Sequence, residues 1–324
     1  MLEALASSRI PFTDRFAKVG PNGLGFHTTA EEAVKSVSLE NKTFVVTGAT
    51  SGLGLETVRV LSLNGARVIG MARTIEKANS IKPLANDRFI PMECDLSEPK
   101  SIAKCSEILI STDTKIDSII CNAGVMGLPK LHQKYGVELQ FLTNHIGHFM
   151  LVNMLKPTLT EKARITVVSS SAHKVFSYSN GIQFDDFSGN RNYNAQKAYG
   201  HSKLANLLFA NELANRLCST TQTANSVHPG VIRTNLFRHY SPLLKFGSAL
   251  IEKLLFKNVE QGAATQVYVS AHPAVSGVSG QYFSNCNLKE TSKHGKDEIM
   301  AKNLWDFSER IVEKITQGND WIDR

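Results

Sequence analysis

Tyr199 and Lys203 stand four residues apart in a stretch whose leucines recur at helical spacing. Side chains at i and i+4 share one face of a helix, so the lysine ammonium is expected beside the tyrosine ring. A tyrosine hydroxyl with an ordinary pKa of ~10 is a poor acid or base at neutral pH, and a neighbouring cation favours its phenolate form. The pair therefore indicates proton transfer at a tyrosine oxygen, although this spacing alone also occurs in helices by chance.

Two further polar signals accompany this pair. An apolar strand runs into the serines Ser169–Ser171. Asn144 lies in a long predicted helix, Tyr135–Leu155, where an asparagine is locally unfavourable unless it faces solvent or bonds within the core. His145 and His148 in the same helix are interpreted as packing or surface residues, because the helix offers no obvious further metal ligands.

A glycine-rich turn within Thr43–Leu61 supplies a second kind of chemistry, the binding of phosphate groups. An apolar β-branched run is followed by the pattern T-G-x-x-x-G-x-G and then by an amphipathic helix pattern. Strand, turn and helix of this kind form the first half of a dinucleotide-binding βαβ unit, with the phosphates at the helix N-terminus. A merely flexible turn is the alternative. The residues expected at this site are Thr47, Gly48, Ser51, Gly52, Leu53 and Gly54.

The end of the second predicted strand indicates which nicotinamide cofactor fits. A site that prefers NAD places an acid after this strand to accept hydrogen bonds from the ribose 2′-hydroxyl. The chain has Ala72 and Arg73 there, so the acid is missing and a guanidinium is present for a 2′-phosphate. The sequence therefore predicts NADP(H), with NAD(H) as the alternative if Arg73 is only an exposed residue at a strand end.

Alternating strand and helix patterns from Lys42 onward predict one doubly wound parallel sheet of about seven strands with helices on both faces, an α/β Rossmann-type fold. Residues 41–324 are assigned to this single domain. Residues 1–40 are assigned to an N-terminal extension with a short capped helix near Thr29–Lys35. The predicted strands are Thr43–Thr47, Arg67–Met71, Arg88–Met92, Ile116–Cys121, Arg164–Ser169, Thr223–His228 and Gly280–Phe283.

Polar residues follow two of these strands at the edge where an open α/β sheet binds its ligand. Asp95 and Leu96 follow the third strand, and Asn122, Ala123 and Gly124 follow the fourth. Structural roles are also open to them, because the aspartate can cap the next helix and the asparagine can be a turn residue.

Composition and charge narrow the class of protein. The 324 residues are 42% hydrophobic, ample for a core, and contain no 18-residue apolar run that could span a membrane. The formal charge of +7 comes from scattered Lys and Arg residues without a basic block, which argues against a nucleic-acid partner. The N-terminus lacks a secretion signal, and the five unclustered cysteines are interpreted as free thiols. We expect an intracellular, reducing compartment, the cytoplasm, with an organelle as the alternative.

Five segments, besides the glycine turn, carry a resemblance to a known family. They are NAGVMG, TNHIGHF, VVSSSAH, AYGHSKLAN and HPGVIRTNL. In this order they resemble the short-chain dehydrogenase/reductase family, and within it the branch of the retinol dehydrogenases and WW-domain oxidoreductase. The likeness extends from about Gly23 to Phe283.

The resemblance implies an NADP(H)-dependent oxidoreductase with four catalytic residues. Tyr199 gives a proton to a carbonyl oxygen or takes one from an alcohol, while Lys203 lowers the tyrosine pKa and holds the nicotinamide ribose. Ser170, which the pattern V-S-S-x-A-H selects from the three serines, bonds the developing alkoxide, with its two neighbours as fallback candidates. Asn144 lies where these enzymes hold a water that relays protons.

The resemblance also implies contacts to the cofactor. Asp95 contacts adenine, and Asn122–Gly124 steadies the central strand beneath the cofactor. Pro229, Gly230 and Thr234 match the loop after the sixth strand, where the threonine contacts the nicotinamide carboxamide.

The segment 237–257 is expected to bear on the substrate. It reads as an amphipathic helix in a mobile lid, which implies a hydrophobic aldehyde, ketone or alcohol, retinoid- or steroid-like among others. A helix that only covers the core is the alternative, and its basic face also suits contact with a membrane surface. An insertion, His173–Asn194, leaves the oligomeric state open between monomer and homodimer.

A cofactor-binding scaffold or redox sensor with little turnover is the main alternative function. The presence of Asn144, Ser170, Tyr199 and Lys203 argues against it, because a binding module needs no acid–base groups. A sugar-nucleotide epimerase also uses a Tyr/Lys pair, but its glycine spacing normally differs and it usually carries a larger C-terminal domain.

Overall fold

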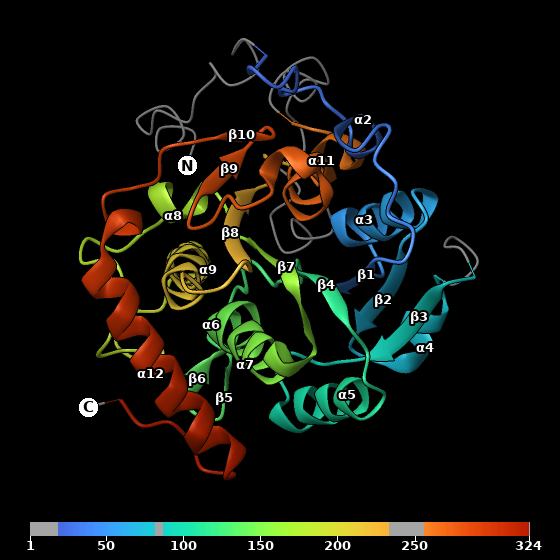
Figure 1. The fold of residues 1–324 in the computed structure, drawn as a ribbon. Helices are drawn as coiled ribbons and strands as arrows, with labels where there is room; N and C mark the ends of the chain where they lie inside the picture. Colours follow the sequence, from blue (N-terminus) through green and yellow to red (C-terminus); the bar gives the residue numbers. More distant parts are fainter. Residues whose placement is uncertain (1–18, 82–86, 233–255, 324) are drawn as a thin grey trace.

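A largely parallel sheet organises the chain (Figure 1). The computed structural model describes residues 19–81, 87–232 and 256–323. Within these ranges the main sheet has eight strands in the order β10-β9-β8-β7-β4-β1-β2-β3, all parallel except for the antiparallel pair β9 and β10. The strands are β1 Thr43–Thr47, β2 Arg67–Ala72, β3 Phe89–Glu93, β4 Ile116–Cys121, β7 Leu159–Val168, β8 Thr223–His228, β9 Tyr282–Ser284 and β10 Asn287–Leu288.

The predicted Rossmann-type fold is confirmed, but the predicted number of strands, about seven, is too low. The additional strand, β10, has only two residues, too few to show an alternating pattern. β7 also begins at Leu159, earlier than the predicted start at Arg164. The strand order reverses direction between β1 and β4, the crevice where open α/β sheets bind ligands.

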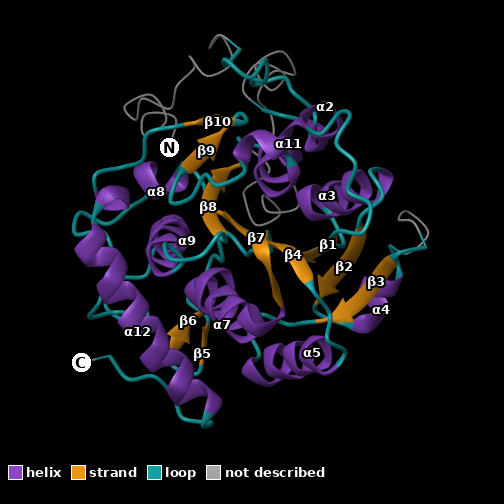
Figure 2. Ribbon diagram, viewed as in Figure 1, coloured by secondary structure: helices purple, strands orange, loops and turns teal. Residues whose placement is uncertain are grey.

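Helices cover both faces of the sheet, as Figure 2 shows. Alternate residues of β1 point to opposite faces: Phe44 and Val46 lie in one apolar core with α2, α3 and α11, and Val45 lies in another with α5, α7 and α9. These helices and their neighbours are α2 Ala30–Ala33, α3 Gly52–Leu63, α4 Ile75–Asn79, α5 Pro99–Ser111, α7 Gly147–Leu155, α8 Ala172–Val175, α9 Ala195–Arg216, α11 Val259–Ala271 and α12 Glu298–Thr316.

The described part of the N-terminal extension packs on this core. Thr29 caps α2 in a capping box with Glu32, which confirms the predicted cap. Ala30 and Val34 are buried against α3 and α11. Asn22 donates a hydrogen bond of 2.8 Å to the carbonyl oxygen of Cys286, so this segment also touches the turn between β9 and β10.

The helix predicted over Tyr135–Leu155 is wrong at its start. Tyr135 and Gly136 have φ angles of 54° and 69°, in the left-handed region, and form the turn of a hairpin. The two strands of this hairpin are β5 (Gln133–Lys134) and β6 (Val137–Glu138).

The helical backbone that follows contains a π-helical turn. It begins as α6 (Leu139–Phe141), widens over Leu142–Ile146 and continues as α7. The N–H of Gly147 bonds to the carbonyl of Leu142, five residues back. π-helical turns are rare in proteins, but those that occur are often found at functional sites. This one carries Asn144.

The insertion before Tyr199 packs on the chain's own C-terminal segment. Phe187 is buried, and its ring lies against those of Phe141, Phe307 and Trp321. Its backbone N–H donates to the Asp323 carboxylate. α12 packs against α9, which Figure 1 shows nearly end-on beside it.

Most of the predicted lid, 237–257, lies outside the described residues. Its last residue, Lys257, is buried and bridges to Ile232. Within the described ranges, no helix is both long and apolar enough to cross a bilayer.

Candidate active site

The structure brings Tyr199 and Lys203 together on the buried face of α9. The helix begins after Asn194, whose side chain accepts hydrogen bonds from the N–H groups of Gln196 and Lys197. Both side chains are almost enclosed, with 9% of Tyr199 and 3% of Lys203 exposed. The lysine nitrogen lies 5.7 Å from the centre of the tyrosine ring, as the four-residue spacing predicts.

Burial gives the Lys203 ammonium unusual acidity. It lowers the pKa of this group to about 8, while the nearby Cys121 thiol opposes the shift. The ammonium nitrogen donates to the carbonyl oxygen of Val168 at 2.8 Å. Among the described residues this carbonyl is its one hydrogen-bond acceptor, so two of its three N–H groups remain for a ribose or a water.

The three serines after β7 have different surroundings. Ser169 is buried and its hydroxyl donates to the backbone oxygen of Lys203 at 2.7 Å. Ser170 is half-buried, and its Oγ accepts from the N–H of Ala172 at 3.2 Å, which leaves the hydroxyl proton for a ligand. Ser171 is half-buried and precedes α8. These surroundings favour Ser170 as the hydroxyl that meets a substrate.

Two histidines hold this serine loop. The Nδ1 of His173 lies against the backbone oxygen of Ser170, and its Nε2 accepts from the N–H of Ser292 at 3.3 Å. The Nδ1 of His228 accepts from the N–H of Ser171 at 3.3 Å. Burial lowers the pKa of His173 to about 4, so it is neutral at pH 7.

The side chain of Asn144 holds the loop that follows the N-A-G turn. Its Oδ1 accepts from the N–H of Val125 at 2.8 Å. Its amide donates to the Val125 carbonyl and to the Ser202 hydroxyl, both at 2.9 Å. Both amide protons are therefore used. The backbone carbonyl oxygen of Asn144 in the π-helical turn has two lone pairs, and His148 Nδ1 lies 2.8 Å from it.

The glycine turn packs closely against its neighbours because it lacks side chains. A Cβ on Gly54 would lie 2.1 Å from the Gly48 oxygen, so this glycine lets α3 pack on the turn. Gly48 has φ of 66° and lies against Ala123, while Gly52 has φ of 53°. The Ser51 side chain makes no cap bond to α3, so the first N–H groups of this helix remain for an anion.

The residues predicted to read the adenosine half lie along the same edge. Arg73 is exposed, directly after β2. Asp95 is half-buried and its carboxylate accepts from the N–H and the hydroxyl of Ser97, at 2.9 and 2.8 Å. The aspartate thus orders the turn before α5, whose N-cap is Glu98. Leu96 packs so closely on α7 that a Cβ at Gly147 would lie 2.2 Å from its oxygen.

The N-A-G turn is bonded to the end of β1. The N–H groups of Asn122 and Ala123 both donate to the Thr47 hydroxyl oxygen, at 2.9 and 3.0 Å. The Asn122 amide also donates to the Thr47 carbonyl at 2.9 Å. A Cβ on Gly124 would lie 3.2 Å from Asn144 Oδ1 and 3.6 Å from Lys203 Nζ, so this glycine lies beside the catalytic candidates.

Pro229 and Gly230 follow β8 at the same edge of the sheet. Gly230 has φ of 99°, and a Cβ there would lie 2.7 Å from the Lys257 side chain. Thr234, the third residue expected in this loop, lies outside the described residues.

Two buried residues of this region were missed by the sequence interpretation. Gln266 of α11 donates to the Asn122 side-chain oxygen at 3.1 Å, across 144 residues of sequence, and no local signal announces it. His148, taken as a packing or surface residue, is fully buried and bonds to Thr47 and to Asn144. Its spacing of four residues from Asn144 is the signal that could have found it.

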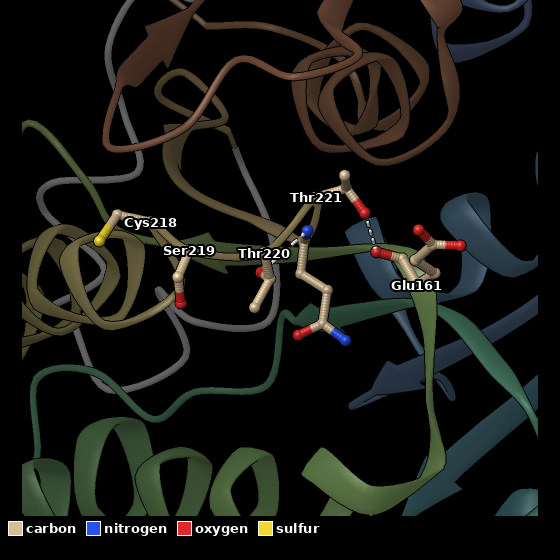
Figure 3. Close-up of a pocket in the computed structure, with 6 residues that line it drawn as sticks. Glu161, Cys218, Ser219, Thr220 and Thr221 are labelled. Atoms are coloured by element: carbon tan, nitrogen blue, oxygen red, sulfur yellow. Dashed lines mark hydrogen bonds between the residues drawn. The ribbon is translucent and has the colours of Figure 1, made fainter.

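The hollow in Figure 3 lies at the opposite edge of the sheet. It encloses about 450 Å³ between Glu161, near the start of β7, and the loop 218–222 that leads into β8. The glycine turn, the N-A-G turn, the serine loop and Gly230 follow the carboxyl ends of strands, whereas this hollow lies at the amino ends. None of the predicted site residues lines it.

Comparisons with known proteins agree with the motifs. A sequence profile described as short chain dehydrogenase matches residues 42–182. The chain is 41% identical over 315 residues to the short-chain dehydrogenase TIC 32 B, chloroplastic, of Brassica napus, covering 92% of this chain and 97% of that protein. It is 38% identical to human retinol dehydrogenase 14, covering 85% and 87%. A crystal structure of an uncharacterized protein from Mycobacterium paratuberculosis aligns with a TM-score of 0.71 and 29% identity, over 87% of this chain and 97% of that one.

Proposed function

The chain belongs to the short-chain dehydrogenase/reductase family, and on this premise we propose that it is an NADP(H)-dependent oxidoreductase of hydrophobic carbonyl and alcohol substrates. The observation that carries the proposal is the enclosed pair of Tyr199 and Lys203 beside the Ser170 loop. A scaffold that only binds a cofactor needs no acid–base group, whereas here an ammonium is buried, at a cost in free energy, beside a buried tyrosine.

The proton is handled by the chain's own residues. In the reducing direction the Tyr199 hydroxyl gives its proton to the carbonyl oxygen, and the Lys203 ammonium favours the phenolate that forms. The Ser170 hydroxyl donates to the same oxygen as negative charge develops on it. The nicotinamide, when bound, supplies or accepts the hydride.

We assign the proton relay to the backbone carbonyl of Asn144. Its side-chain amide protons are used by Val125 and Ser202, whereas its carbonyl oxygen has a lone pair besides the one that faces His148 Nδ1. A water on this carbonyl is the route by which the Lys203 region regains a proton after each turnover.

The fit of a dinucleotide is supported by the glycine turn and by the open N-terminus of α3. The residues proposed to hold it are those predicted from the sequence, with the adenosine half at Arg73 and Asp95 and the nicotinamide half at Lys203, Gly230 and Thr234. Arg73 supports NADP(H) over NAD(H), since an exposed guanidinium after β2 can pair with a 2′-phosphate.

The proposed substrate class and compartment are drawn from the relatives and from the cysteines. A relative is named a retinol dehydrogenase, which supports a bulky apolar aldehyde, ketone or alcohol. The cysteines are free thiols, which supports a reducing compartment. Another relative is named chloroplastic, so an organelle stands beside the cytoplasm as a candidate.

The test measures NADPH and NADH oxidation with hydrophobic aldehydes and ketones, for the wild type and for Tyr199→Phe. We expect NADPH-dependent turnover that is lost in Tyr199→Phe while NADPH still binds. Turnover with NADH alone would remove the role given to Arg73. NADPH binding without turnover across the substrate panel would favour the scaffold.

A further inference from the structure

His148 is bonded at both ring nitrogens to groups of the proposed site. The side chain lies in the first turn of α7 and has no exposed surface. Its Nε2 is 2.8 Å from the Thr47 hydroxyl oxygen, 101 residues away in sequence. Its Nδ1 is 2.8 Å from the backbone oxygen of Asn144.

The partners of His148 determine where its proton lies. A backbone carbonyl only accepts, so Nδ1 must carry a proton to bond Asn144. The Thr47 hydroxyl oxygen already accepts the N–H groups of Asn122 and Ala123, so its own proton is directed to Nε2. The other acceptor near this hydroxyl, the Ile120 carbonyl, is more distant at 3.4 Å.

A neutral ring fits this arrangement and a charged ring does not. An imidazolium would direct a second N–H at the Thr47 hydroxyl, which already accepts two. Burial lowers the pKa of His148 to about 4, and the charge of Lys203 acts in the same direction. The ring is therefore neutral at pH 7, with its proton on Nδ1.

We propose that His148 is a positioning residue that fixes the π-helical turn, and hence the Asn144 carbonyl, to the cofactor-binding turn at Thr47. The proposal rests on the proposed function, in which Thr47 belongs to the cofactor site and the Asn144 carbonyl to the proton relay. One ring joins the end of β1, the N-A-G turn bonded to Thr47 and the start of α7. The hydrogen bond to Thr47 serves cofactor binding, and the hydrogen bond to Asn144 serves the proton relay.

Two substitutions of His148 each remove one of its two hydrogen bonds and keep the other. In His148→Gln the side-chain amide reaches the place of Nε2 and can still accept from Thr47, but the donor to Asn144 is lost. In His148→Asn the amide lies at the place of Nδ1 and can still donate to Asn144, but Thr47 loses its acceptor. The matched control is His145→Gln, because His145 is also buried, lies in the adjacent π-helical turn and bonds to Ser308 of α12.

The measurements are the NADPH dissociation constant, the single-turnover rate of NADPH consumption and the melting temperature. For His148→Gln we expect a rate about tenfold lower with near wild-type NADPH affinity. This factor corresponds to the loss of one hydrogen bond. For His148→Asn we expect NADPH affinity about tenfold weaker, with the smaller loss in rate. For His145→Gln we expect only a lower melting temperature. If both His148 variants lost rate and NADPH affinity together, or if neither lost any, the role of His148 would be core packing only.

A readout that needs no turnover separates failure of this inference from failure of the proposed function. Long-range ¹⁵N–¹H spectra of histidine-labelled wild-type protein, with His148 assigned by its absence in His148→Gln, give the tautomer directly. We expect a neutral ring protonated at Nδ1 at pH 7. A ring protonated at Nε2 would overturn the inference even in an active enzyme. A third outcome is an Nδ1-protonated ring, weaker NADPH binding in His148→Asn but not in His148→Gln, and no turnover. This outcome would count against the proposed reaction and not against the role of His148.

Discussion

The ammonium nitrogen of Lys203 donates a hydrogen bond to the carbonyl oxygen of Val168, 2.8 Å away. In return, the hydroxyl of Ser169, the residue after Val168, donates to the backbone oxygen of Lys203. These two bonds tie the middle of α9 to the end of β7. The distance between Tyr199 and Ser170 is thus set by the fold before any substrate arrives.

Lys203 should set the alkaline limit of carbonyl reduction. Burial lowers its pKa to about 8, so above that pH the ammonium is lost and the phenolate of Tyr199 loses its stabilising charge. We expect kcat/KM to fall as the pH rises through about 8, the value for the unliganded site. The arginine of Lys203→Arg stays charged over this pH range. We therefore expect this variant to be less active but to show no fall in kcat/KM as the pH rises through about 8. The same fall in Lys203→Arg would assign the titration to another group.

Ser170 and Ser169 should respond differently to replacement by alanine. Ser170→Ala removes the donor to the developing alkoxide, and we expect kcat to fall about 10²-fold or more with little change in melting temperature. Ser169→Ala removes a buried bond to Lys203, and we expect a loss of about 1 kcal/mol in the free energy of unfolding. Kinetics and denaturant titration of both variants check this. If only Ser169→Ala lost turnover, the choice of Ser170 would be wrong.

Arg73 should determine the preference for NADPH. Arg73→Ala removes a charged partner of the 2′-phosphate, so we expect the NADPH dissociation constant to rise about tenfold or more and that of NADH to stay the same. Arg67→Ala is the matched control, because Arg67 is exposed at the opposite end of β2. Fluorescence titration with both cofactors gives the answer, and equal effects of the two substitutions would point to general surface charge.

Gly54 should tolerate no side chain. In Gly54→Ala the new Cβ would meet the Gly48 oxygen at 2.1 Å and the Asn122 amide at 2.7 Å, so we expect loss of cofactor binding and a lower melting temperature. Gly25→Ala is the control, since its Cβ would make only ordinary contacts, at 3.5 Å or more. Normal cofactor binding by Gly54→Ala would contradict the proposed path of the phosphates.

The buried histidines should make the fold sensitive to acid. Burial lowers the pKa of each, so the unfolded chain binds more protons between pH 6.5 and about 4 and stability falls as the pH drops through this window. We expect unfolding at pH 5 to take up about one proton per histidine, measurable from the pH dependence of the melting temperature. His201→Gln should take up one proton fewer. The histidines concerned are His145, His148, His173, His201 and His228.

The sheet could be predicted well from the sequence. β1, β4 and β8 begin and end where predicted, because each is a short run with almost every residue buried. β10 was missed because it pairs through two residues that follow a turn with positive φ at Asn285 and Cys286, and such a pair leaves no periodic signal.

The site could be predicted less completely. The residue types at Tyr199, Lys203 and Ser170 carry their own chemistry, so a motif finds them. The role of the Asn144 side chain and the bond of His148 to Thr47 depend on a backbone turn and on contacts across 101 residues, which helical periodicity does not express. The spacing of hydrophobic residues indicates which face of a regular helix is buried. A π-helical turn changes that face without changing the composition, so the spacing does not reveal it.

The length of the turn Leu142–Ile146 has a consequence for anyone who transplants or redesigns this site. Deleting one residue there would restore an ordinary α-helix and rotate everything after it by about 100° relative to everything before it. His148 would then turn away from Thr47, even with every side chain of the motif retained. In a graft onto another scaffold, residue count in this turn matters as much as residue identity.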